Sequence, residues 1–218
     1  MADDSGRRVE ISPVTDFATY EVTTERMRLR AYRRDDLEEF SDLHGREDVA
    51  RFLPWETRDA EASRAALERH LSMTLAEDDD GITLAGFDLQ TGRLVGEFVL
   101  FLRSVEHRGG EVGYVLHPDF QGRGLATEGA LVMLAIGFEV MGLHRVVARI
   151  DARNTPSAAV LDRLGMRREA LLVKNEWVKG EWSDEADYAM LEEEWVAGHG
   201  TRSLIASKVS AHAAACSA

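Results

Sequence analysis

The spacing of apolar and polar residues changes several times along the chain, and each spacing predicts a type of element. Alternation indicates strands, and apolar residues three and four positions apart indicate helices. The predicted strands cover residues 25–32, 82–89, 94–102, 111–117 and 144–151, with a long hairpin over 168–191. The first predicted helix begins at Asp35. Three further helices are predicted over residues 59–75, 126–138 and 157–164. The resulting order, β-α-α-β-β-β-α-β-α-β-β, indicates the α+β (mixed α/β) class.

The chain divides into one large folded region and two polar ends. Residues 1–23 are mixed and polar, which predicts an arm or a frayed strand. Residues 24–197 hold all the predicted elements, and a chain of 218 residues with 44% hydrophobic content is able to bury one sizeable core. Residues 198–218 are rich in Ala and Ser, so we expect a disordered tail.

Composition narrows the class of protein. Cys216 is the only cysteine, so the chain is unable to form an internal disulfide or a Cys-based metal site. We expect no bound metal. The sequence shows no signal peptide and no apolar run of membrane-spanning length, so we expect a cytoplasmic protein that does not bind membranes. The net charge of −13 disfavours nucleic acid and would attract a cationic partner, although acidic residues also simply keep proteins soluble.

A glycine-containing turn follows the strand at 111–117 and opens the helix at 126–138. Gly122 and Gly124 permit positive φ, and a helix start presents unpaired N–H groups with the positive end of the helix dipole. Arg123 adds a positive charge beside them. This arrangement predicts a phosphate or pyrophosphate site. The spacing matches neither the P-loop nor the dinucleotide fingerprint.

Two motifs identify a known superfamily. Gln121-x-x-Gly124-x-Ala126 resembles the coenzyme A pyrophosphate loop of the GCN5-related N-acetyltransferases (GNAT). Asn154-x-x-Ser157, a short helix and Leu164-Gly165-Met166 resemble a second element of that superfamily. Their order, together with the late hairpin turning near Gly180, resembles the RimJ/RimL-type branch, which contains the ribosomal-protein-alanine N-acetyltransferases. The resemblance runs from about Thr24 to about Trp195.

The resemblance implies acetyl-CoA as the cofactor and a mostly antiparallel sheet that splays at its site. The strand ending at His117 would bend or bulge, so that the backbone of Val115 and Leu116 pairs with the pantetheine. Asn154 would hold the pantetheine amides or thioester, although a turn or cap role suits it equally. The pyrophosphate would be held by Gln121, Gly122, Arg123, Gly124, Leu125, Ala126 and Thr127.

Acetyl transfer to an amine also needs a base and a proton for the departing thiolate. Glu111 is the first candidate base and Glu176 the second, while a cross-strand ion pair is the structural alternative for Glu111. His107 and His117 are further candidates because histidine as a residue type serves as a base, although a lone histidine in a turn is more often polar surface. Ser157 would protonate the thiolate, or would be an ordinary residue at a helix start.

Aromatic residues at two loops would wall an acceptor pocket, or else close the core edge or a dimer contact. The residues expected in that pocket are Phe52, Trp55 and Trp177. The sequence leaves a homodimer open.

These features predict an acetyl-CoA-dependent N-acetyltransferase that works by direct attack in a ternary complex. The resemblance favours a protein N-terminal α-amine as the acceptor. One alternative is a small amine, such as an aminoglycoside, polyamine or amino acid, which a compact acidic pocket would favour over a peptide. The other is a non-catalytic acyl-CoA-binding regulatory module.

Overall fold

The computed structural model describes residues 20–199, and within them the chain folds around one sheet. The strands are β1 (Glu21–Thr23), β2 (Met27–Ala31), β3 (Gly81–Asp88), β4 (Leu94–Ser104), β5 (Gly109–Leu116), β6 (Arg145–Asp151), β7 (Arg167–Val178) and β8 (Glu181–Leu191). The α-helices are α1 (Leu37–His44), α2 (Glu47–Ala50), α3 (Ala60–Leu71), α4 (Leu125–Ala135), α5 (Thr155–Arg163) and α6 (Glu192–His199). Single turns of other helix types are η2 (Arg34–Asp36), η3 (Pro118–Phe120) and η4 (Ile136–Val140). The predicted α+β class is confirmed by this architecture and its structural neighbours.

Three short elements were not predicted as separate elements. β1 pairs with β2, within the segment interpreted as an arm or a frayed strand. α2 is a single turn between the first two predicted helices. α6 begins at Glu192, and its Trp195 stacks on Phe138 at 5.6 Å. The remainder of the expected tail, and residues 1–19, lie outside the described residues. None of the described helices is long and apolar enough to cross a membrane.

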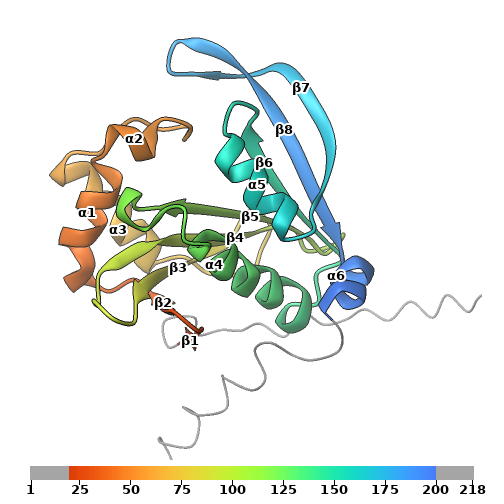
Figure 1. Cartoon of the computed structure of the whole chain (residues 1–218), viewed down its shortest axis with the longest axis horizontal. Coiled ribbons are helices and arrows are strands. Elements are labelled where there is room, and N and C mark those ends of the chain that lie inside the picture. The colour runs from red at the N-terminus through yellow and green to blue at the C-terminus, as the bar shows by residue number, and fades with distance from the viewer. Residues whose placement is uncertain (1–19, 200–218) are drawn as a thin grey trace, which may run out of the picture.

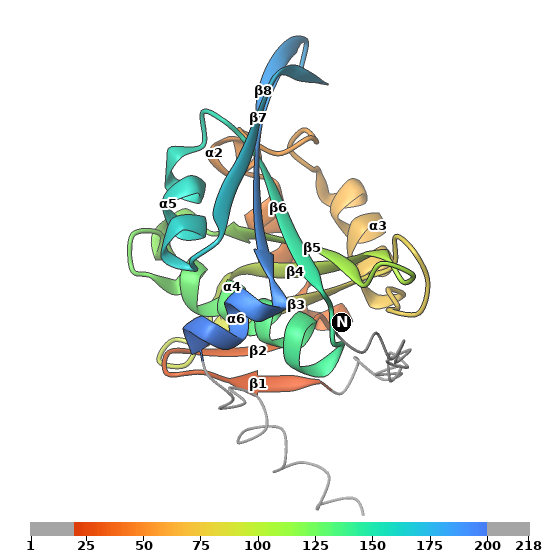
Figure 2. The ribbon, with the colours of Figure 1, turned by 90° about the vertical axis from the view of Figure 1, so that its right-hand side faces the viewer.

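Helices cover both faces of the sheet. Its strand order is β1-β2-β3-β4-β5-β6-β8-β7. Figure 2, which looks nearly along the sheet, shows α3 on one side and α4 and α5 on the other. One buried cluster joins the sheet to α1 and α3 through Phe40, Leu43 and Leu67. The larger cluster joins the opposite face to α4 through Phe98 and Met133. α1, α3 and α4 therefore bury their apolar residues against the sheet.

The sheet opens at its centre because β5 and β6 are paired over only part of their length. They run parallel and are in register from Gly109 to Glu111 on β5, whereas β4 stays paired with β5 as far as Leu116. Beyond Glu111 the two halves of the sheet diverge, and Figure 1 shows β6, β7 and β8 rising away from β4 and β5. The predicted splay is therefore present. It is a divergence from β6 rather than a bulge against β4, since the β4–β5 register shifts only between Leu102 and Ser104.

The hairpin of β7 and β8 extends beyond the rest of the sheet. Its turn contains Lys179 and Gly180, both with positive φ, and Gly180 is where the sequence predicted the turn. The pairing register of β7 shifts between Leu172 and Glu176, and Lys174 in that interval also has positive φ. This bulge re-aims the outer part of β7.

Candidate active site

The glycine loop, defined here as residues 121–124, and the first turn of α4 form an anion-binding nest. Gly122 and Gly124 have φ of 72° and 77°, a conformation that L-residues adopt at a cost. The first hydrogen bond of the helix joins the N–H of Glu128 to the carbonyl of Gly124. The backbone N–H groups of residues 122–127 are therefore left without a backbone acceptor in the described part of the chain. These N–H groups at the positive end of α4 fit a pyrophosphate.

Three residues of the predicted set have structural contacts instead. The N–H of Gln121 donates to the Pro118 carbonyl, and its side-chain amide donates to the Leu116 carbonyl at 3.2 Å. The guanidinium of Arg123 lies 5.4 Å from the centre of the Phe120 ring. The Thr127 hydroxyl accepts a hydrogen bond from Arg163. Gln121 therefore braces the loop, and the nest begins one residue later than the sequence analysis placed it.

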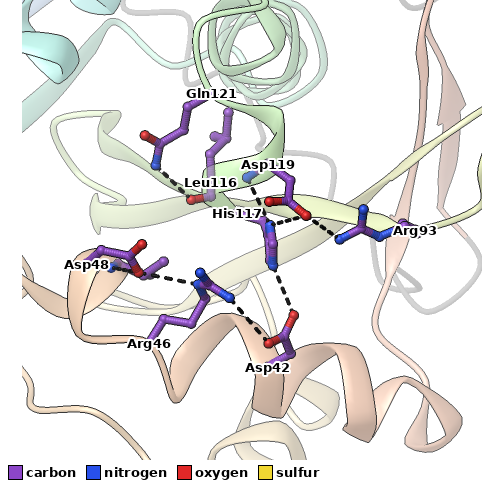
Figure 3. A network of polar contacts seen from close by, with 9 residues as sticks. Asp42, Arg46, Asp48, Arg93, Leu116, His117, Asp119 and Gln121 are labelled. Carbon is purple, nitrogen blue, oxygen red and sulfur yellow. Dashed lines mark hydrogen bonds and ion pairs between the residues drawn. The ribbon is translucent and has the colours of Figure 1, made fainter.

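A buried histidine ties the glycine loop to α1. The Nε2 of His117 lies 2.9 Å from a carboxylate oxygen of Asp42, and its Nδ1 accepts the backbone N–H of Asp119 at 3.2 Å (Figure 3). Because Nδ1 accepts a hydrogen bond, Nε2 carries the proton and donates to Asp42. Asp119 also pairs with Arg93 at 2.7 Å. His117, one of the histidines considered at the site, therefore positions the loop.

Two cavities meet where the sheet opens. The loop cavity, of about 620 Å³, lies between the glycine loop, the end of β5 and α5. The hairpin cavity, of about 500 Å³, lies between β4, β5, the hairpin and the segment after α2. Six residues line both cavities, namely Phe52, Leu53, Tyr114, Val115, Asn154 and Ser157. A group held in the loop cavity is thus able to reach a molecule in the hairpin cavity.

Two hydroxyl groups stand at this junction. The Tyr114 hydroxyl lies 2.9 Å from the hydroxyl and 3.1 Å from the carbonyl of Ser157. Burial raises the pKa of Tyr114 to about 12, so this group stays protonated. Asn154 caps α5, because its side-chain oxygen accepts the N–H of Ser157 at 3.1 Å. The cap leaves the side-chain NH₂ of Asn154 as a donor at the junction. Tyr114 is not among the residues that the sequence motifs single out.

Glu111, the first candidate base, is held by two arginines. One of its carboxylate oxygens accepts from Arg103 at 2.9 Å and from Arg149 at 2.8 Å. Both arginines come from strands flanking β5, which is the cross-strand ion pair considered as the alternative. Its role as a base stays a prediction. The two guanidinium groups fix the position of this carboxylate on β5.

Glu176, the second candidate, lies beside a carboxylate that the sequence analysis missed. Both Glu176 and Glu185 line the hairpin cavity. Burial and then the neighbouring charge of Glu176 raise the pKa of Glu185 to about 7. Asn175 donates to Glu185 at 3.2 Å. A carboxyl group with a pKa of about 7 is able to accept a proton near neutrality, which suits a base acting on an amine.

A periodic signal for Glu185 was present in the sequence. Glu181, Ser183 and Glu185 alternate along β8, and all three line the hairpin cavity. Alternate polar positions on a strand indicate one polar face. The partner strand that completes the pair could not be read in the same way, because the bulge between Leu172 and Glu176 changes the register.

A second buried carboxylate, Glu97, lies at the same cavity and is held by two polar side chains. Glu97 accepts from Tyr32 at 3.1 Å and lies 3.2 Å from the Nε2 of His44. Burial alone would raise the pKa of Glu97, but His44, with smaller effects of His70 and Tyr32, outweighs it and lowers the pKa to about 2. Glu97 is therefore a fixed anion beneath the cavity and a weak base.

The aromatic residues separate into two groups. Phe52 and Trp55 line the hairpin cavity, as expected for an acceptor pocket. Trp177 is not among the lining residues. Its side chain is 61% exposed and meets Trp182 edge-on at 5.4 Å. The structure therefore brings two of the three predicted acceptor residues to the cavity.

The geometry of the two cavities indicates a class of enzyme. A nest for pyrophosphate, a strand edge freed by the splay and a second cavity joined through hydroxyl groups together fit a transferase with a phosphate-bearing donor. Both the donor and the acceptor of the transferred group would bind at once.

The comparisons agree with that class. The family model described as "Acetyltransferase (GNAT) domain" matches residues 26–167. The uncharacterized N-acetyltransferase YnaD of Bacillus subtilis (strain 168) is 30% identical, over 80% of this chain and 98% of that protein. A GNAT-family acetyltransferase from Bacillus anthracis has a solved structure with 31% identity and a TM-score of 0.72, over 80% of this chain and all of that one. A spermidine N-acetyltransferase from Vibrio cholerae, solved with CoA and spermine, shares the fold at 20% identity, with a TM-score of 0.69 over 79% and 99% of the two chains.

The chain belongs to the GNAT family and is an acetyl-CoA-dependent N-acetyltransferase. The residues of the nest fit this cofactor, since they offer free N–H groups at a helix start and two glycines that leave the approach open.

Proposed function

We propose that this acetyltransferase modifies the primary amine of a small molecule bound in the hairpin cavity. The observation that carries the proposal is the junction of the two cavities at Tyr114, Val115 and Ser157. An amine in the hairpin cavity would attack a thioester presented from the loop cavity directly, within one ternary complex. The N–C bond forms as the C–S bond breaks.

Each proton in this reaction has an assigned place. The carboxyl pair of Glu176 and Glu185 accepts the proton of the attacking amine. The Ser157 hydroxyl donates a proton to the departing thiolate, with Tyr114 hydrogen-bonded behind it. Acetyl-CoA supplies the acetyl group, and the backbone of Val115 and Leu116, which the splay leaves unpaired with β6, aligns the pantetheine.

The size and closure of the hairpin cavity favour a small acceptor. Its volume of about 500 Å³ lies in the usual range for small-molecule sites. The ammonium of Lys179 at the hairpin turn donates to the carbonyl of Ala50 at 2.5 Å, which joins the hairpin to the end of α2. The name of the Vibrio relative likewise refers to a small amine.

The expectations of a protein N-terminal acceptor, of the RimJ/RimL branch and of a cytoplasmic location stay predictions. Acetyl transfer measured by mass spectrometry tests the proposal directly. The purified chain is incubated with acetyl-CoA and a panel of small amines and of Ala- and Ser-initiated peptides. We expect acetylation of small amines that depends on Glu185 and Ser157. Labelling of peptides alone would overturn the small acceptor, and tight coenzyme binding without transfer to any amine would favour the regulatory module.

A further inference from the structure

Most charged side chains around the hairpin cavity already have a partner of opposite charge. Glu111 is bonded to Arg103 and Arg149, and Arg153 bridges two further carboxylates of the cavity wall. Glu97 is paired with His44. These groups neutralise one another and leave little net charge for a ligand.

Four charged groups of the same wall remain without an ion pair among the described residues. Two are cations, Arg51 and Lys179, and two are the carboxyl groups of Glu176 and Glu185. Arg51 lies over the ring of Phe52 at 4.9 Å, and Lys179 donates only to a backbone carbonyl. The two carboxyl groups lie close enough that the charge of Glu176, after burial, raises the pKa of Glu185 to about 7.

The unpaired cations and the unpaired carboxyl groups occupy different parts of the wall. Lys179 donates to the carbonyl of Ala50, the residue before Arg51, so both cations belong to the part of the wall where the hairpin meets the end of α2. Lys179 lies in the hairpin turn, whereas Glu176 and Glu185 lie on the strands β7 and β8, on either side of that turn. The cavity thus has a cationic end at the hairpin turn, called the roof here and formed by Arg51 and Lys179. Its anionic end lies along β7 and β8, at Glu176 and Glu185.

We propose that the acceptor carries an anionic group as well as its amine, and that Arg51 and Lys179 bind that anionic group while Glu176 and Glu185 face the amine. This assignment rests on the proposed function and names the substrate class of the same site. Arginine and lysine both recognise carboxylate and phosphate oxygens, so the shared chemistry is a small amine with an oxyanion at its far end. A polyamine would place a second ammonium beside two cations, which is unfavourable.

Matched acceptors test the charge preference. The wild-type chain is assayed with acetyl-CoA and a series of ω-amino carboxylates, the diamines of the same lengths and the corresponding ω-amino phosphates. We expect kcat/KM for the better oxyanion series to exceed kcat/KM for the diamines by roughly tenfold or more. A roughly tenfold ratio corresponds to the contribution of one charge-assisted hydrogen bond. The preference between carboxylate and phosphate identifies the group. The length of the best acceptor reports the separation of the two ends.

Variants of the roof assign the effect to the two cations. Lys179→Glu and Arg51→Glu are expected to lower kcat/KM for the amino oxyanions by roughly tenfold and to raise it for the diamines. Lys179→Gln is the matched control, because its amide still donates to the Ala50 carbonyl without the charge. It should reduce the oxyanion preference and raise the diamine rates, both by less than the charge reversal Lys179→Glu does. Coenzyme affinity, measured by calorimetry, is followed in every variant as a readout of folding.

The outcomes separate this inference from the function on which it rests. Failure to acetylate any amine would overturn the proposed function itself. Transfer to diamines as fast as to the oxyanion series, or charge reversals that change all series equally, would overturn the anionic acceptor while leaving acetyl transfer intact.

Discussion

The hydroxyl of Tyr114 lies 2.9 Å from the hydroxyl of Ser157, where the two cavities of the molecule meet. Tyr114 comes from β5 and Ser157 from the first turn of α5, so the pair joins the two sides of the opened sheet. When Tyr114 donates to Ser157, the proton of Ser157 is free to point at the departing sulfur. The raised pKa of Tyr114 means that it orients this hydroxyl and keeps its own proton.

Ser157→Ala is expected to lower kcat by about a hundredfold, the lower end for a general acid, because a thiolate is a weakly basic leaving group. Tyr114→Phe should lower kcat by about tenfold, since it removes one orienting hydrogen bond. Steady-state kinetics measures kcat, and calorimetric titration with CoA measures coenzyme affinity. Coenzyme affinity should stay near that of the wild type in both variants. An unchanged kcat in Ser157→Ala would mean that water protonates the thiolate.

Gly124→Glu is expected to abolish coenzyme binding. Gly124 has a φ of 77° at the start of α4, and a carboxylate there would place negative charge in the pyrophosphate nest. The positive φ alone costs about 1–2 kcal/mol for an L-residue. Calorimetry with CoA measures the loss.

Gly92→Glu is the matched control for this variant. Gly92 has a φ of 71° in the β3–β4 turn, and a Cβ there meets nothing within 4 Å, so the same charge and the same backbone strain fall outside the site. Its coenzyme affinity should equal that of the wild type. Near-normal affinity in Gly124→Glu would refute the assignment of this loop.

The activity is expected to rise with pH through an apparent pKa of about 7. Burial and the charge of Glu176 raise the pKa of Glu185 to about 7, so the proton-accepting form becomes populated above that pH. Glu185→Gln should lower kcat/KM and remove this inflection from the pH profile. An inflection that persists in Glu185→Gln and disappears in Glu111→Gln would move the role of base to Glu111.

The same carboxyl group should make stability depend on pH. The ordinary pKa of a glutamate side chain is 4.5, and the pKa of Glu185 in the folded chain is about 7. Between these two pH values the folded chain holds a proton that the unfolded chain has released. Stability therefore falls as pH rises through this window. Thermal unfolding measured across it should show that fall in the wild type and a smaller one in Glu185→Gln. Equal slopes in the two proteins would contradict the raised pKa.

The fold and the cofactor loop could be predicted because their signals are local. Alternation, helical spacing and the glycines at 122 and 124 are properties of neighbouring residues, and the structure places those elements within a few residues of the prediction. The short strand β1 was not predicted, because a three-residue strand shows too few alternations of apolar and polar residues to be recognised.

The acceptor side could be predicted only in part, because it depends on contacts between distant segments. The arginines beside Glu111 come from strands that flank β5, and the sequence gives no sign that they converge on one oxygen. The contact of Lys179 with Ala50 spans a separation of 129 residues. Trp177 was expected in the pocket, and its exposed position follows from the alternation of β7 with the cavity-lining Glu176 and Val178.

Gly129→Ala is expected to destabilise the fold even though alanine is the better helix former. Gly129 lies inside α4, where alanine would ordinarily add up to about 1 kcal/mol. A Cβ at this position would sit 2.2 Å from the ring of Phe98, which is fully buried and has no room to move. Overpacking of this kind costs about 1–3 kcal/mol. Urea unfolding should therefore show a lower free energy of unfolding.

Two further variants attribute that loss to the ring. Gly109→Ala, whose new Cβ would lie 3.9 Å from the nearest side-chain atom, should change stability by less than about 0.5 kcal/mol. Phe98→Leu should make Gly129→Ala much less costly, which a double-mutant cycle in urea would measure as a favourable coupling between the two sites. Additive effects of the two substitutions would show that α4 shifts away from β4 instead. A shift of α4 would carry the pyrophosphate nest with it, so coenzyme affinity measured in the same variants distinguishes the two responses.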